Sequence, residues 1–420
     1  MMRRYNKFLL MTALALLLSL SAGASDNTLR LDYIFTGGCS DTGIALSRMS
    51  VTPGWYGRRV NMDRVPVAGN GDIRVVEDGS GRILYAASFS TLFQEWLTSD
   101  ESKRMVKAFE NTFLVPLPDS AATVTLRLFD ARRKVIAEYS HRVDPADILI
   151  ARRGVSGVGR RYIHRGGDPK ECIDVAILAE GYAAGELDSF YAAAATAVES
   201  IFLHEPFGSN RERFNFLAVG AESADSGVSV PRDGKWCQTA VGSNFDTFYI
   251  ARYLTTDHIF DMHDILEGLP YEHIIILANT PVYGGGGIYN SYTLTTAEHG
   301  KFQPVVVHEF GHSFGALADE YDTDSYDDPY YFPDVEPWEE NVTTRVDLKS
   351  KWQDMIDAGV PGVGLYEGAG YQAKGVWRPA ADCRMRTNTA TEFCPVCRRA
   401  LGRMIDFNLV GQPGESFVCR

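Results

Sequence analysis

The sequence has no excess of positive charge and no repeated or low-complexity segments. Its 420 residues include 41 lysines and arginines against 54 aspartates and glutamates, which gives a net charge of −13. Because nucleic acids bind to basic surfaces, this balance excludes nucleic acid as a partner. What remains is an ordinary globular composition, 45% hydrophobic and 23% charged, in a chain long enough for two domains.

Long apolar runs are absent beyond the first two dozen residues, so we expect no stable membrane insertion of the mature protein. The N-terminus has a positive head at residues 3–7, an apolar run at 8–20 and small residues at 22–24, as a signal peptide does. A membrane anchor is disfavoured because the run is shorter than the roughly 20 residues that span a bilayer. We therefore expect residues 1–24 to be a cleaved signal peptide and the protein to be exported, to the periplasm, the cell surface or the medium.

Cysteine is scarce, and its odd number leaves at least one thiol unpaired or paired with another chain. The cysteines are Cys39, Cys172, Cys237, Cys383, Cys394, Cys397 and Cys419. Three interpretations of the group at 383–397 stay open. The Cys394–Cys397 pair has redox-motif spacing but lacks a thioredoxin-like setting, and a structural zinc site lacks an obvious fourth ligand nearby. A disulfide from Cys383 to Cys394 or Cys397 is favoured in an exported protein.

The first part of the mature chain is predicted to be an antiparallel β-sandwich. Residues 29–35 nearly alternate between apolar and polar, and residues 82–85 have the pattern of another strand. The clearest hairpin joins residues 123–129 to 135–139 through a polar turn. We assign residues 25–150 to this domain. It shows no catalytic constellation, so we interpret it as an accessory or substrate-presenting module.

Beyond a basic, glycine-rich linker at 151–159, strands begin to alternate with helices. The expected strands are 173–178, 214–219 and 273–278, and the expected helices are 186–202 and 244–254. This alternation predicts an α/β domain with a largely parallel or mixed sheet and helices on its faces, over residues 151–420.

The segment His308-Glu309-Phe310-Gly311-His312 is the most informative part of the sequence. On a helix, residues four apart share a face, so His308 and His312 can bind one Zn²⁺ ion. Glu309 lies one residue further round and suits a different role. Its carboxylate can take a proton from a zinc-activated water and pass it to the leaving amine.

Such a five-residue pattern also arises by chance, so its context matters. An apolar helix precedes it, and Gly315 follows at a spacing that can end the helix in a left-handed conformation. Upstream, residues 283–294 have the pattern of a flexible loop that enters an exposed edge strand. Such a strand beside a zinc site could bind an extended peptide by strand addition.

Several segments together resemble the M64 peptidase family, named for an IgA-cleaving member. They are HEFGHSFGALADEY at 308–321, EGAGY at 367–371, GVWRP at 375–379 and the cysteine-containing CRMRTN and FCPVC segments at 383–397. The resemblance covers most of the chain and implies a metzincin-like zinc endopeptidase acting on protein or peptide substrates. It implies His308 and His312 as zinc ligands, Glu309 as catalytic base and Met385 as the methionine of a turn below the metal.

The third zinc ligand departs from the metzincin spacing, because Ala318 stands where that ligand is expected. We predict Asp319 instead, reached after a turn at Gly315, with Glu320 as the main competitor and Asp322 and Glu367 as weaker ones. A straight helix would carry Asp319 about 10 Å beyond His312, so the chain must turn back.

Two further hypotheses are left open. The acidic stretch 319–340, with Asp322, Asp324, Asp327 and Asp328, lacks the spacing of an EF-hand, which favours a solvated loop over a calcium site. The alternative to a peptidase is a non-catalytic secreted or surface binding protein with a degenerate metal site. Glu309 argues against it, because a purely structural metal needs no base beside it. Cleavage of immunoglobulin does not follow from the family name, since specificity resides in binding pockets.

Overall fold

The computed structural model of the protein describes residues 26–323 and 330–411. The expected signal peptide at 1–24 and Cys419 lie outside these ranges, as do three of the four aspartates of the acidic stretch. Within the described ranges, every helix is too short or too polar to cross a membrane.

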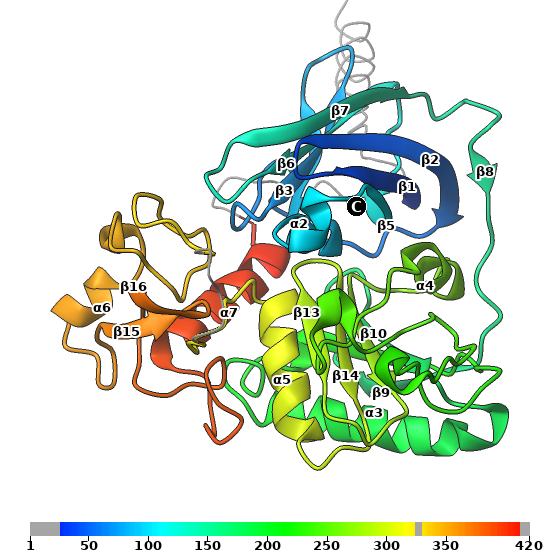
Figure 1. Ribbon diagram of the computed structural model, residues 1–420. Coiled ribbons are helices and arrows are strands. Elements are labelled where there is room, and N and C mark those ends of the chain that lie inside the picture. The colour runs from blue at the N-terminus through cyan, green and yellow to red at the C-terminus, as the bar shows by residue number, and fades with distance from the viewer. Residues whose placement is uncertain (1–25, 324–329, 412–420) are drawn as a thin grey trace, which may run out of the picture.

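The N-terminal part contains two four-stranded sheets (Figure 1). One has the order β5-β1-β2-β8, with β1 (Asn27–Gly38), β2 (Asp41–Pro53), β5 (Lys107–Pro116) and β8 (Ala151–Arg152). The other has the order β4-β3-β6-β7, with β3 (Gly71–Glu77), β4 (Ile83–Phe89), β6 (Ala122–Phe129) and β7 (Val135–Val143). All pairs are antiparallel except β2 with β8.

The hairpin predicted from the sequence is β6–β7 and is confirmed. Alternate residues of β6 are buried, among them Val124, Leu126 and Leu128, because successive side chains of a strand point to opposite faces. These side chains and those of β1, such as Leu31 and Phe35, belong to one hydrophobic cluster that both sheets supply. The two sheets are therefore held together by a common core.

The second part is built around a mixed six-stranded sheet with the order β13-β14-β12-β10-β11-β9. The inner strands are parallel, and the edge strands β9 and β13 run antiparallel to their neighbours. The strands are β9 (Arg160–Arg165), β10 (Ile173–Glu180), β11 (Phe214–Val219), β12 (His273–Ala278), β13 (Gly285–Ile288) and β14 (Tyr292–Thr296). The mixed sheet expected from the alternating pattern is present, and β10, β11 and β12 contain or match the three predicted strands.

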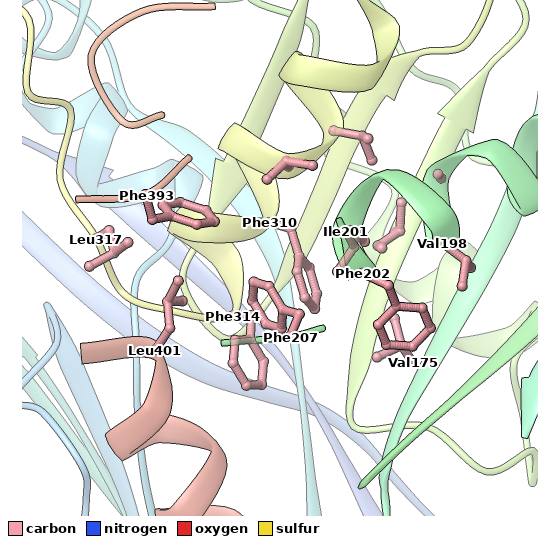
Figure 2. Packing of buried hydrophobic residues seen from close by; sticks show 14 of the residues in the cluster. Val175, Val198, Ile201, Phe202, Phe207, Phe310, Phe314, Leu317, Phe393 and Leu401 are labelled. Carbon is pink, nitrogen blue, oxygen red and sulfur yellow. The ribbon is translucent and has the colours of Figure 1, made fainter. Parts of the chain in front are cut away.

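Five helices belong to this part of the described chain. They are α3 (Leu187–Phe202), α4 (Ile259–Ile265), α5 (Phe302–Ser313), α6 (Gln353–Asp357) and α7 (Pro395–Leu409), and a small hairpin of β15 (Tyr366–Ala369) and β16 (Gln372–Arg378) precedes α7. Helix α6 lies beside this hairpin, away from the sheet (Figure 1). Helix α3 confirms the predicted helix at 186–202. Figure 2 shows Phe310 of α5 and Phe314, the residue that follows the helix, packed among Phe207, Phe202 and Ile201, with Leu401 of α7 close by. The apolar side of α5 is thus held in the core.

The helix predicted at 244–254 is wrong. This segment contains only a 3₁₀ turn at Thr247–Tyr249, and Asp246, Phe248 and Tyr249 have positive φ values of 64°, 53° and 65°. Asn244 and Thr255 exchange two backbone hydrogen bonds, of 3.0 and 3.2 Å, which close the segment into a loop. Phe245 and Leu254 are buried from this loop, whereas Tyr249 and Ile250 are exposed.

The N-terminal part packs directly on the second part rather than forming a detached module (Figure 1). Arg30 of β1 forms an ion pair of 2.5 Å with Asp264, and the backbone N–H of Ser90 donates to the carbonyl of Tyr289 at 3.0 Å. Helix α2 (Leu92–Leu97) begins at this boundary, with the Thr91 hydroxyl accepting from Gln94 N–H at 3.2 Å. That N-cap fixes the direction in which α2 projects toward the second domain.

Candidate active site

Strand β13 and helix α5 lie side by side, and glycines make the approach possible (Figure 1). A β-carbon at Gly285 would lie 3.0 Å from Glu309 Oε1, and one at Gly287 would lie 2.4 Å from the Glu309 carbonyl oxygen. The glycine run that the sequence suggested as a flexible loop is therefore a packed strand. It is the edge of the sheet, as predicted, although a bridge from Tyr253 covers Gly285.

Gly287→Ala tests this packing. The added methyl would also lie 2.9 Å from His312 Cβ, so β13 must move away from α5. Overpacking of this kind costs about 1–3 kcal/mol, and we expect that loss in the free energy of unfolding by denaturant. Gly300→Ala is the matched control, because a β-carbon there meets nothing within 4 Å. Equal stability of the two variants would contradict the close packing.

The structure brings His308, His312 and Asp319 together. The two Nε2 atoms are 3.1 Å apart, and Asp319 Oδ1 lies 3.0 Å from His308 Nε2 and 3.3 Å from His312 Nε2. Asp319 is only 7% exposed, so its carboxylate is held inside the protein. One carboxylate oxygen of Glu309 also falls within 4.8 Å of ligand atoms of both histidines.

Other groups hold the far side of each of these three residues. Nδ1 of His308 donates to the carbonyl of Arg384 at 2.9 Å, and Nδ1 of His312 donates to the carbonyl of Leu317 at 2.5 Å. The Tyr371 hydroxyl donates to Asp319 Oδ2. A carbonyl oxygen can only accept, so each neutral imidazole presents a lone pair at Nε2. Two nitrogen lone pairs and a carboxylate oxygen therefore converge on one point, where a cation satisfies all three.

The electrostatics of the site favour positive charge at this point. Burial opposes ionisation of His312, but the Asp319 carboxylate outweighs burial and raises the pKa of His312 to about 9. Burial also works against the Asp319 carboxylate, yet the two histidines hold its pKa well below the ordinary value. Burial raises the pKa of Glu309, and the same histidines oppose that rise.

The chain turns back after α5, as predicted, but not through a left-handed glycine. Helix α5 ends at Ser313, and the residue with positive φ is Ala316, at 55°. A β-carbon at Gly315 would lie 2.4 Å from Leu401 Cδ2, so this glycine is required by the approach of α7. The turn brings Asp319 to the histidines, but its left-handed residue is Ala316 and not the glycine expected from the sequence.

Met385 lies under α5. It is fully buried in a turn, and its sulfur would be 2.6 Å from a β-carbon at Gly311. Gly311 in the HEFGH segment thus leaves room for the thioether.

Sequence analysis missed several polar residues near the site. Glu95 comes from α2 in the N-terminal domain, where the Tyr253 hydroxyl donates to it, and burial raises the pKa of Glu95 to about 7. Arg252 donates to the Tyr321 hydroxyl at 3.3 Å. No pattern along the chain marks Glu95 or Arg252, whereas Tyr321 and Tyr371 stand within the segments that resemble the M64 family.

The competing candidates for the third ligand lie elsewhere. The Glu320 carboxylate points to a group of buried cysteines, and Glu367 accepts from Lys374 and from Gly375 N–H near the surface. Asp322 is exposed.

The favoured disulfide from Cys383 to Cys394 or Cys397 is wrong. All six cysteines that the structure describes are free, and the sulfurs of Cys383 and Cys397 are 3.8 Å apart, against about 2.05 Å in a disulfide.

Comparison with known protein families identifies the chain as a peptidase. Residues 162–362 and 361–405 match the sequence profile of IgA Peptidase M64, and residues 21–140 match that of the Peptidase M64 N-terminus. The chain therefore belongs to the M64 peptidase family and has its two-domain architecture. No curated protein matches the chain significantly.

Proposed function

We propose that the protein is an exported zinc-dependent endopeptidase that cleaves protein or peptide substrates. Its parts are a signal peptide at 1–24, a β-sandwich accessory domain at 25–150 and a metzincin-like catalytic domain at 151–420. His308, His312 and Asp319 are the zinc ligands, Glu309 is the general base, and Met385 forms the methionine turn. The convergence of the three ligand atoms carries this proposal.

The spacing of those atoms fits zinc. Bonds of about 2.0–2.1 Å to a tetrahedral ion place ligand atoms about 3.3 Å apart. The three separations here are 3.0, 3.1 and 3.3 Å. Three protein ligands leave one position for water or substrate, which is typical of catalytic rather than structural sites. When bound, zinc activates a water and polarises the scissile carbonyl.

Glu309 supplies the proton transfers. It is on the same helix as the two histidines but is not held by Asp319 or by the backbone carbonyls that fix them. Its carboxylate accepts a proton from the attacking water and then delivers that proton to the amine leaving group. An intact carboxylate at this position favours a peptidase over the binding protein with a degenerate site.

The substrate is proposed to lie along β13. This strand is an edge of the sheet and contacts α5 through Gly285 and Gly287. An extended peptide that pairs with the outer edge of β13 would pass beside Glu309 and His312. Arg252 lies near Gly285, at the start of β13. There it can limit how far the peptide extends past the bridge between Tyr253 and Gly285.

Metal removal tests the function directly. The mature protein is incubated with a peptide library, and cleavage products are identified by mass spectrometry before and after treatment with a strong chelator. We expect chelation to abolish cleavage and added zinc to restore it, because the ligands act only through the metal. Cleavage that persists after elemental analysis shows the metal to be gone would rule the mechanism out.

A further inference from the structure

A second group of residues with metal-ligating side chains is formed by one glutamate and three cysteines. Glu320, Cys383, Cys394 and Cys397 offer one carboxylate oxygen and three sulfurs, all within 4.8 Å of one another. None of the four residues is more than 5% exposed. Cys394 is the N-cap of α7 and Cys397 lies in its first turn, whereas Glu320 comes from the loop after α5. The sequence near the cysteines shows no fourth ligand. In the folded chain, Glu320 from the loop after α5 takes that position.

The distances in this group agree with a bound metal better than with a disulfide. The sulfurs of Cys383 and Cys397 are 3.8 Å apart. Two thiolates bound to a tetrahedral zinc at about 2.3 Å are separated by about 3.8 Å, whereas disulfide sulfurs are about 2.05 Å apart. Cys397 Sγ also lies 3.0 Å from Glu320 Oε1.

The Glu320 carboxyl group is buried, and one of its two oxygens has no hydrogen-bond partner. Oε1 accepts from Asn341 Nδ2 at 3.0 Å and contacts Cys397, but Oε2 is buried with no hydrogen-bond partner. Among the described residues, no lysine, arginine or histidine forms an ion pair with Glu320. An ionised carboxylate buried in this state is unfavourable, and a bound cation would remove that cost.

We propose that Glu320, Cys383, Cys394 and Cys397 bind a second, structural zinc ion. Three sulfurs and one carboxylate oxygen suit zinc, and four protein ligands close the coordination sphere, as in structural sites. Binding releases the thiol protons to solvent as the three sulfurs become thiolates. Cys394 and Phe393 also line a surface pocket.

This site supports the first one through the adjoining backbone. Asp319, the proposed third catalytic ligand, directly precedes Glu320, and Glu320 N–H donates to the carbonyl of Met385 at 2.8 Å. Arg384, whose carbonyl accepts from His308, directly follows Cys383. A zinc ion bound by Glu320 and Cys383 therefore fixes both segments that hold the catalytic ligands. Zinc binding at this second group does not depend on peptidase activity.

Elemental analysis of the mature full chain, expressed with added zinc, tests the proposal. We expect about two zinc ions per chain. The His308→Ala/His312→Ala variant should keep about one, and Cys383→Ser/Cys397→Ser should also keep about one. Cys172→Ser is the matched control, since Cys172 is a buried cysteine outside the group and should leave both ions in place.

Two further measurements decide the case if the double cysteine variant does not fold. Glu320→Gln is a nearly isosteric change and should lower the zinc content. The chain should stay folded, so that Cys172, outside the group, remains buried. Cobalt in place of zinc in His308→Ala/His312→Ala should give a thiolate-to-cobalt charge-transfer band. A double histidine variant that folds without any bound metal, or a disulfide between any two of these three cysteines in the non-reduced protein, would overturn the proposal.

Discussion

Glu309→Gln is expected to lower turnover by about 10²- to 10⁴-fold while zinc content stays unchanged. Glutamine keeps the size of the side chain but cannot accept the proton of the attacking water. Because His308, His312 and Asp319 hold one another without Glu309, the ligand set survives the change. The loss should appear in kcat measured on a fluorogenic peptide, with metal content determined on the same preparation.

The matched control is Glu298→Gln, an exposed carboxylate just before α5, which should leave turnover unchanged. If Glu309→Gln retains full activity, Glu309 is not the base. If it loses zinc together with activity, the carboxylate belongs to the ligand set rather than to proton transfer.

Asp319→Ala is expected to remove the catalytic zinc and with it all measurable hydrolysis. Loss of an outer hydrogen bond to a ligand typically costs about 10- to 100-fold in metal affinity, and loss of the ligand itself should exceed that. The variant leaves two histidines, too few for a stable zinc site. Titration with a zinc-competing dye measures the affinity of each variant.

Two other variants give losses of zinc affinity with which the loss in Asp319→Ala can be compared. Tyr371→Phe removes only the hydroxyl that donates to Asp319, so it should weaken zinc binding within the outer-contact range of about 10- to 100-fold. Glu320→Gln should affect the catalytic zinc much less, since its carboxylate faces the cysteines. A stronger effect of Glu320→Gln than of Asp319→Ala at the histidine site would reverse the ligand assignment.

Local patterns in the sequence predicted the parts of the fold that depend on local physics. Helix α3 and strands β10, β11 and β12 were predicted because their apolar residues follow helical or strand periodicity. The facing of His308 and His312 follows from the geometry of one helix. These features are determined by residues that are close in sequence, so they can be predicted from the sequence.

Features that depend on distant contacts were mispredicted or missed. Residues 244–254 have a helical pattern, but the pairing of Asn244 with Thr255 closes them into a loop. Glu320 was considered only as a rival of Asp319, because nothing local shows that its side chain turns toward Cys383 and Cys397. Glu95 approaches the site from the N-terminal domain, which the sequence presented as catalytically silent.

X-ray diffraction from crystals of the mature protein, recorded above and below the zinc absorption edge, tests the central claim most directly. We predict an anomalous peak about 2.0–2.2 Å from His308 Nε2, His312 Nε2 and Asp319 Oδ1, with Glu309 beside its open position. Absence of a peak between those three atoms in zinc-grown crystals, or a peak whose ligands exclude either histidine, would contradict the account.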